Sequence, residues 1–267
     1  MNCVTPMDRR ACNEGTGQVK TALIENLTEL RLRAMLASFE DTARRAEKET
    51  LSYEQYLLEL SDRECEQRQG NRIRRLLQDS RLPLEKSLAN FDVKRLPTKV
   101  SRQMKVLLDG GFLDRRENLL AFGNPGAGKS HLLCALAQEV ISTQGRKIKY
   151  TTCALLVQDL LVAKRELQLR QEIKKLAKYE GLIIDQMGYG QQSREEMEVL
   201  FTLLAERYER GSVLLTSNLP FSRWEEIFRD TMTTAAAIDR LVHHCIILEL
   251  NIPSYRMEQA KKNREAE

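Results

Sequence analysis

Apolar residues follow a helical pattern in the first third of the chain. Between residues 21 and 34 they recur at spacings of four, three and four, which predicts one helical face formed by Leu23, Leu27, Leu30 and Ala34. A second helix is predicted to open at Ser52, because Gln55 stands three residues later and completes a capping box. Pro83 ends this module, which we place at residues 21–83. The preceding residues 1–20 are polar and aperiodic, so we expect a loose leader there.

The pattern changes beyond residue 84, after a linker that carries Phe91 and Asp92. Short apolar runs then alternate with amphipathic helical segments, which is typical of an α/β domain with a parallel sheet. We predict five strands, at Asn118–Phe122, Lys147–Thr151, Leu182–Asp185, Val213–Ser217 and Cys245–Leu250. Capping boxes predict helix starts after Ser193, with Glu196, and after Ser222, with Glu225. This domain covers residues 84–257, and a charged, frayed tail occupies 258–267.

Bulk composition excludes several classes of protein. The 267 residues carry a net charge of only +4 although 30% are charged, so a basic surface has to come from local clustering. No apolar run approaches the roughly 18 residues that span a bilayer, and the N-terminus lacks a secretion signal, so we expect a cytoplasmic protein with no membrane partner. The six cysteines form no CxxC pair, which indicates reduced and mostly packed thiols rather than a zinc site. His243 and His244 have no acid beside them in the sequence, and we interpret them as structural.

The strongest chemical signal is the segment from Gly123 to Ser130, which fits GxxxxGK[ST] between a predicted strand and a predicted helix. In such a P-loop, backbone N–H groups and the helix N-terminus face phosphate oxygens. Lys129 would reach the β- and γ-phosphates, and the Ser130 hydroxyl would sit on magnesium. An ordinary glycine-rich turn is the alternative. The predicted nucleotide-binding residues are Gly123, Asn124, Pro125, Gly126, Ala127, Gly128, Lys129, Ser130 and His131.

A P-loop needs a second anchor for Mg²⁺, and the segment GLIIDQMGY supplies Asp185 after an apolar strand. In the P-loop ATPases with this order of elements a catalytic glutamate follows, whereas this chain has Gln186, whose amide cannot accept a proton. We interpret Gln186 as a replacement for a glutamate; a naturally occurring glutamine is the alternative. The next strand ends at Asn218, which is either a sensor that holds the attacking water or a turn residue.

Several segments resemble one family: GNPGAGKSHL, LIIDQMGY, ERYERGSVLLTSNLPFSRW, AAAIDRLVHH and SYR are similar to the IstB group of AAA+ ATPases, which help transposition and are related to the DnaC helicase loaders. The resemblance runs from about residue 21 to 257. It implies that Arg240 is an arginine finger reaching a neighbouring subunit, and that Arg256 senses the γ-phosphate. Without the resemblance, both could be solvated surface arginines. Gln186 departs from the family, where Glu or Asp is expected.

An arginine cluster lies between Arg63 and Arg81, interleaved with acidic residues. It is either the solvated face of a helix or a contact to DNA phosphates that reads no sequence, for which the candidates are Arg68, Arg72, Arg74 and Arg75. Phe221 and Trp224 are expected to pack in the core or between subunits rather than stack on bases.

We therefore expect an AAA+ ATPase that binds ATP and Mg²⁺ between subunits of a homo-oligomer, assembles on duplex DNA and assists a transposase. Hydrolysis is expected to be very slow. The alternatives are a helicase loader and an ATP-locked DNA scaffold without turnover.

Overall fold

The computed structural model describes residues 6–188, 193–224 and 231–258. The chain divides into two compact units, Met1–Arg72 and Ile73–Glu267. The division falls inside helix α3 rather than at Pro83, where the sequence suggested it.

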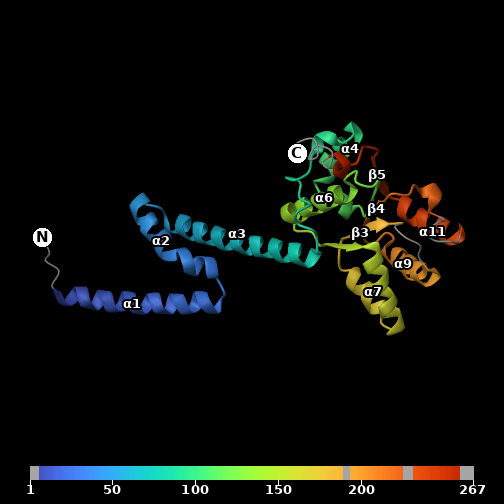
Figure 1. Ribbon diagram of the computed structural model, residues 1–267. Coiled ribbons are helices and arrows are strands. Elements are labelled where there is room, and N and C mark those ends of the chain that lie inside the picture. The colour runs from blue at the N-terminus through green and yellow to red at the C-terminus, as the bar shows by residue number, and fades with distance from the viewer. Residues whose placement is uncertain (1–5, 189–192, 225–230, 259–267) are drawn as a thin grey trace, which may run out of the picture. The chain divides into compact units, whose positions relative to one another are not determined.

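The first unit is helical, as expected, and contains α1 (Pro6–Glu29), α2 (Arg33–Glu49) and the greater part of α3 (Tyr53–Ser80) (Figure 1). The capping box before α3 is confirmed: Ser52 N–H donates to Gln55 Oε1 over 2.9 Å, and Gln55 N–H donates to Ser52 Oγ over 3.3 Å. Leu27, Phe39 and Leu60 form its small core. Helix α1 starts at Pro6, so residues 6–20, which we expected to be a loose leader, belong to this helix.

The prediction of one continuous helical face from Leu23 to Ala34 is wrong. Helix α1 ends at Glu29, Arg31 adopts a left-handed φ of 57°, and Ala34 lies in the first turn of α2. The carboxylate of Glu64, on α3, accepts the N–H of Ala34 over 2.8 Å and so satisfies a donor that every helix start leaves open. This partner is 30 residues away in sequence, and the apolar spacing alone gives no sign of it.

The second unit is built on a five-stranded sheet. Its strands are β1 (Asn118–Gly123), β2 (Ile148–Thr152), β3 (Gly181–Met187), β4 (Ser212–Ser217) and β5 (Cys245–Leu250). All neighbours are parallel, in the order β2-β3-β4-β1-β5, so the expected α/β class with a five-stranded parallel sheet is confirmed. Strand β4 lies between β1 and β3, which places its carboxyl end between the P-loop and Asp185.

The remaining elements surround this sheet. They are the short helices η1 (Val93–Arg95), α5 (Gly111–Asp114) and η2 (Phe221–Arg223), and the longer helices α4 (Thr98–Leu107), α6 (Lys129–Gln144), α7 (Cys153–Arg165), α8 (Leu169–Leu176), α9 (Arg194–Arg207) and α11 (Thr231–Val242). The capping box of Ser193 with Glu196 is present at the start of α9. Ser222 lies in η2, and its predicted partner Glu225 is outside the described residues.

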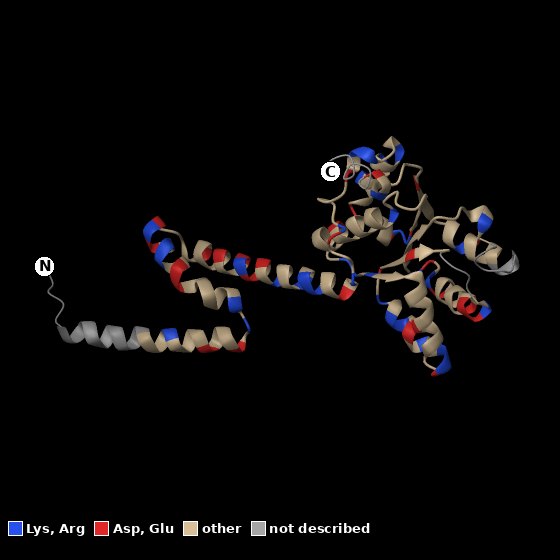
Figure 2. Cartoon of the chain, in the orientation of Figure 1, with Lys and Arg blue, Asp and Glu red and all other residues tan. Residues whose placement is uncertain are grey.

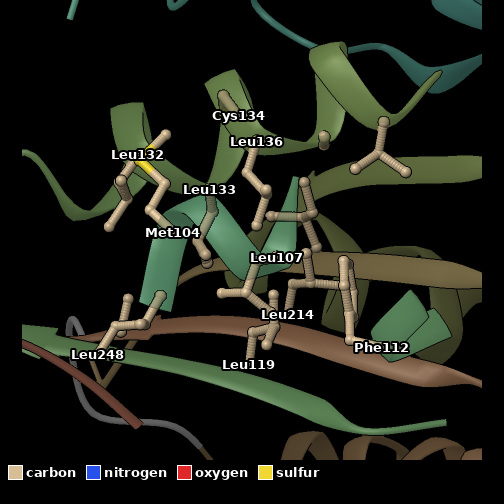
Figure 3. Packing of buried hydrophobic residues seen from close by; sticks show 14 of the residues in the cluster. Met104, Leu107, Phe112, Leu119, Leu132, Leu133, Cys134, Leu136, Leu214 and Leu248 are labelled. Carbon is tan, nitrogen blue, oxygen red and sulfur yellow. The ribbon is translucent and has the colours of Figure 1, made fainter. Parts of the chain in front are cut away.

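Alternate strand residues face two separate cores, because side chains in a strand point to opposite faces in turn. Leu119 packs with α4 and α6 on one face (Figure 3), while Leu120 packs with α7, α9 and α11 on the other. The second core includes Trp224, which is fully buried against Phe122 and Phe221, so the expected packing role of this aromatic pair is confirmed. In the described part of the chain, every helix is too short or too polar to cross a membrane.

Candidate nucleotide and metal site

The P-loop turns directly from β1 into α6, and two of its glycines are fixed by close approaches. A Cβ on Gly123, whose φ is 147°, would lie 2.3 Å from the carbonyl oxygen of Leu250. A Cβ on Gly126, whose φ is 80°, would lie 2.0 Å from Ser254 Oγ. Only glycine fits at both positions, since each requires a left-handed backbone with no room for a side chain. The loop is therefore packed against the end of β5 and the segment that follows it.

Lys129 is the first residue of α6, and its side chain folds back over the loop. Its Nζ donates to the carbonyl oxygens of Gly123 over 2.7 Å and of Asn124 over 3.0 Å. The side chain is 7% exposed, and burial lowers the pKa of Lys129 whereas the nearby Asp185 opposes that shift. A buried ammonium that donates to carbonyl groups is poised to exchange them for an anionic ligand.

Asp185 is the centre of a hydroxyl cluster at the carboxyl edge of the sheet. Its Oδ1 accepts the hydroxyls of Ser130 over 2.6 Å and Thr216 over 2.5 Å, and its Oδ2 accepts the Tyr150 hydroxyl over 2.9 Å. Burial and the adjacent carboxylate raise the pKa of Tyr150, so this phenol stays a protonated donor. The expected proximity of Ser130 and Asp185 is present, while Tyr150 and Thr216 were not singled out from the sequence.

This donor set fits a divalent cation. Asp185 is 1% exposed, and none of the salt bridges between described residues involves it, so its charge is compensated by hydroxyl dipoles. Burying a carboxylate without a cation is costly. Oxygen ligands, one carboxylate and one hydroxyl beside a phosphate-binding loop are the environment that Mg²⁺ occupies in nucleotide sites. Ser130 and Asp185 would hold the ion, which would neutralise charge on the phosphates.

Gln186 follows Asp185 at an irregularity of β3, where the pairing with β4 shifts register between Ile184 and Met187. It has a left-handed φ of 63°, and Thr216 Oγ1 accepts its N–H over 2.8 Å. The side chain is exposed and lines the cavity beside the P-loop. A left-handed non-glycine residue is strained, and such strain gathers at functional sites. Backbone geometry therefore presents residue 186 to the nucleotide cavity.

Asn218 directly follows β4, on the strand that pairs with β3. Its Oδ1 is buried without a hydrogen-bond partner among the described residues. An unsatisfied buried amide at this edge is consistent with a sensor that acquires its partner when nucleotide binds.

A cavity of about 340 Å³ opens over the P-loop. It is lined by Pro125 to His131, with Gln186 and Arg256, so these predicted residues are brought together. Gly123, Asn124, Asp185 and Asn218 do not line it directly.

The cavity also has walls that sequence reasoning missed. One comes from the expected linker, where Phe91 stands edge-on to His131 with ring centroids 5.0 Å apart and contacts the space beside Gly128. The other is Tyr255, whose N–H donates to Gly126 O over 3.0 Å and whose ring lies under Arg95. Isolated aromatic residues in otherwise polar segments were the available signal.

Comparison with known proteins places this arrangement in a family. The model of the IstB-like ATP-binding proteins matches residues 25–263. A putative insertion sequence ATP-binding protein of Sinorhizobium fredii (strain NBRC 101917 / NGR234) is 38% identical over 89% of this chain and 81% of its own length. The chain belongs to the IstB-like ATP-binding proteins.

A second relative, the insertion sequence IS5376 putative ATP-binding protein of Geobacillus stearothermophilus, is 34% identical to this IstB-like chain over 92% of it and 98% of the relative. Among solved structures, AMPPCP-bound DnaA from Aquifex aeolicus is similar with a TM-score of 0.54, at 16% identity, covering 70% of this chain and 57% of that one. The AAA+ P-loop fold expected from the sequence is thus confirmed, and the chain is an AAA+ ATPase by family.

The two arginines expected to act on nucleotide lie in different places in this IstB-like protein. Arg256 lines the cavity. Arg240, near the end of α11, does not; its guanidinium stacks over Phe201 with 4.5 Å to the ring centroid and donates to Ala236 O. Arg240 therefore lies away from the nucleotide cavity of this chain.

The candidate DNA-binding arginines all lie on α3, a helix that carries both basic and acidic residues (Figure 2). Arg68 is ion-paired with the buried Glu64 over 2.8 Å, so it supports the cap of α2. Arg72, Arg74 and Arg75 are all exposed to solvent. These three are the better candidates for phosphate contacts.

The fold gives the two histidines an acidic neighbour that is not beside them in the sequence. Glu209 lies beside His243 and His244 although it is distant in sequence, and ligand atoms of the three lie within 4.8 Å of one another. All three are exposed, and the Tyr208 hydroxyl hydrogen-bonds His243 Nδ1 over 3.0 Å.

The free cysteines fit the expectation of packed thiols only in part: Cys134 and Cys153 are buried, but Cys65 is exposed.

Proposed function

We propose that this chain is the ATP-dependent DNA-binding helper of a transposition system. In this proposal it binds ATP with Mg²⁺, assembles on duplex DNA as a homo-oligomer and recruits or stimulates a transposase. Support comes from the relatives, which are described as insertion sequence ATP-binding proteins, and from the AAA+ fold. The observation that carries the proposal is the Asp185 carboxylate, which is buried and hydrogen-bonded by the hydroxyl of Ser130, the last residue of the P-loop motif.

We further propose that hydrolysis is very slow. Asp185, Ser130 and Lys129 keep the groups that bind nucleotide and metal. Gln186 can hydrogen-bond the attacking water but cannot take its proton, and a positioned general base contributes roughly 10²- to 10⁴-fold. The ATP-bound assembly would then persist, because the exposed side chain at position 186 cannot act as the base that hydrolysis needs.

DNA binding in this proposal is electrostatic and largely indifferent to sequence. The exposed Arg72, Arg74 and Arg75 supply the positive charge, whereas no described element presents a recognisable base-reading motif. Binding should therefore weaken steeply as the salt concentration rises. A plot of log affinity against log salt concentration should be linear, with a slope of about −0.9 for each phosphate that the protein neutralises.

The test measures binding of the full chain to fluorescent duplex DNA of two unrelated sequences, with and without ATP and Mg²⁺, across a salt series. We expect tight binding only with ATP and Mg²⁺, loss of the nucleotide effect in Lys129→Ala, and equal affinity for both duplexes. Replacing Arg72, Arg74 and Arg75 together by Ala should reduce the salt slope by up to about 2.7.

A matched control removes three charges elsewhere, by replacing Lys174, Lys175 and Lys178 with Ala on and after α8. This control should leave most of the slope in place. DNA affinity that is independent of nucleotide would contradict the proposed function. If the salt slope is unchanged when Arg72, Arg74 and Arg75 are replaced, these arginines form a solvated helix face and do not contact DNA.

A further inference from the structure

Tyr150 lies on β2, the strand next to β3, which carries Asp185. No role has been assigned to Tyr150 so far. Its backbone pairs with Ile183, two residues before Asp185 on the neighbouring strand β3. From there its hydroxyl reaches along the sheet to Asp185 Oδ2 over 2.9 Å. Tyr150 is partly buried and does not line the nucleotide cavity, so it contacts the site only through Asp185.

The donors around Asp185 are divided between its two oxygens. Ser130 and Thr216 both donate to Oδ1, whereas Tyr150 is the side chain in the described part of the protein that donates to Oδ2. The terminal torsion of an aspartate is broad and roughly two-fold, so packing alone does not fix the plane of the carboxylate. A hydrogen bond on the second oxygen sets that plane.

We propose that Tyr150 is a positioning residue for the magnesium site, holding Asp185 Oδ2 so that the opposite edge of the carboxylate stays turned toward Ser130. The inference rests on the proposed binding of Mg²⁺ with ATP. Partners that orient a metal-binding side chain typically change metal affinity by 10- to 100-fold when they are removed. Tyr150 thereby adds a fourth group to the site formed by Ser130, Asp185 and Thr216.

A purely structural role is the competing explanation, because the Tyr150 ring also packs against the core beneath α6. The change Tyr150→Phe separates the two, since it keeps the ring and removes only the donor. Tyr179→Phe is the matched control: its hydroxyl makes an equivalent hydrogen bond, to Asp79 Oδ2 over 2.8 Å, outside the nucleotide cavity.

The experiment measures ATP affinity by titration calorimetry, first in EDTA and then across a Mg²⁺ series, for the full chain and both variants. Binding of Mn²⁺ in the presence of ATP, followed by electron paramagnetic resonance, reports the metal directly. For Tyr150→Phe we expect ATP affinity in EDTA within about twofold of wild type, and a Mg²⁺ midpoint raised at least about tenfold. Tyr179→Phe should match the wild type in both.

An unchanged or lowered Mg²⁺ midpoint in Tyr150→Phe would overturn the inference. So would an equal loss of ATP affinity with and without metal, which is the result of a structural role, or the same shift in Tyr179→Phe. If the wild-type chain itself binds ATP no more tightly with Mg²⁺, the proposed function fails along with the inference. The wild-type titration therefore distinguishes the two failures.

Discussion

Replacing Gly126 by Ala should weaken ATP binding because the P-loop is packed against the segment after β5. The added Cβ would lie 2.0 Å from Ser254 Oγ and 2.9 Å from Ser254 Cβ. Both distances are far below van der Waals contact, so Ser254 has to move. Its neighbour Tyr255 donates its N–H to Gly126 O over 3.0 Å, and this hydrogen bond would be lost with the movement.

The magnitude follows from two contributions. A left-handed φ such as the 80° of Gly126 costs a non-glycine residue roughly 1–2 kcal/mol. The lost hydrogen bond adds about 0.5–1.5 kcal/mol. The free variant relieves these costs by leaving the binding conformation of the loop, and ATP binding has to restore that conformation. ATP affinity should therefore be roughly 10- to 300-fold weaker, at about 1.4 kcal/mol for each tenfold change.

The assay is titration calorimetry with ATP, accompanied by thermal unfolding of the nucleotide-free chain. Adding Ser254→Gly to Gly126→Ala should recover part of the affinity, because it removes the steric overlap but not the backbone strain; Ser254→Ala should recover less, because its Cβ remains. Gly70→Ala is the control, since a Cβ there meets nothing within 4 Å. Wild-type affinity in Gly126→Ala, or no recovery from Ser254→Gly, would refute the reasoning.

Three further predictions concern other parts of the molecule. Arg207 is 2% exposed and donates to four backbone carbonyls, so Arg207→Met should destabilise the chain by at least about 3 kcal/mol in urea unfolding; a loss below about 1 kcal/mol would contradict this role. In a Gln186→Glu background, Arg240→Ala should lower turnover by about 10³- to 10⁵-fold, and mixing it with Lys129→Ala subunits should restore turnover at composite interfaces; no restoration would show that Arg240 does not act in trans. Burial alone would raise the pKa of Glu64, but hydrogen bonds from Arg68 and from two N–H groups of α2 outweigh it and hold that pKa below its ordinary value. Its stabilisation is therefore present above the unfolded pKa of about 4.3 and lost as pH falls through the lower folded value. Helix content followed by circular dichroism should show a smaller acid-induced loss in Glu64→Gln, and an identical acid transition would count against this coupling.

Much of the second unit was predictable because its signals are local. Strand β5 has the predicted bounds, β1 and β4 differ from prediction by one residue, and the P-loop lies where its glycines required. Contacts between distant segments were not predictable in the same way. The hydroxyl of Tyr150 reaches Asp185 only because β2 and β3 are neighbours, and Tyr255 reaches Gly126 only because β5 lies beside β1.

Other differences have equally physical origins. The break between α1 and α2 depends on the carboxylate of Glu64, a tertiary contact that overrides the helical spacing of Leu30 and Ala34. The left-handed backbone of Gln186 depends on the pairing of β3 with β4 and on the Thr216 hydroxyl. Sequence identified Gln186 as a chemical anomaly, but only the fold shows that its side chain faces the cavity.

Phosphate release by Gln186→Glu, measured with DNA and Mg²⁺ present, tests the central claim most directly. Glutamate has nearly the same shape, and position 186 is already directed at the cavity, so the change supplies a base without rebuilding the site. Turnover should rise by at least about a hundredfold, and the ATP-bound assembly on DNA should become short-lived. The double variant with Asp185→Asn should stay slow, because it lacks the metal ligand. Rapid turnover by the chain with Gln186, or a Glu variant that is no faster, would contradict the account.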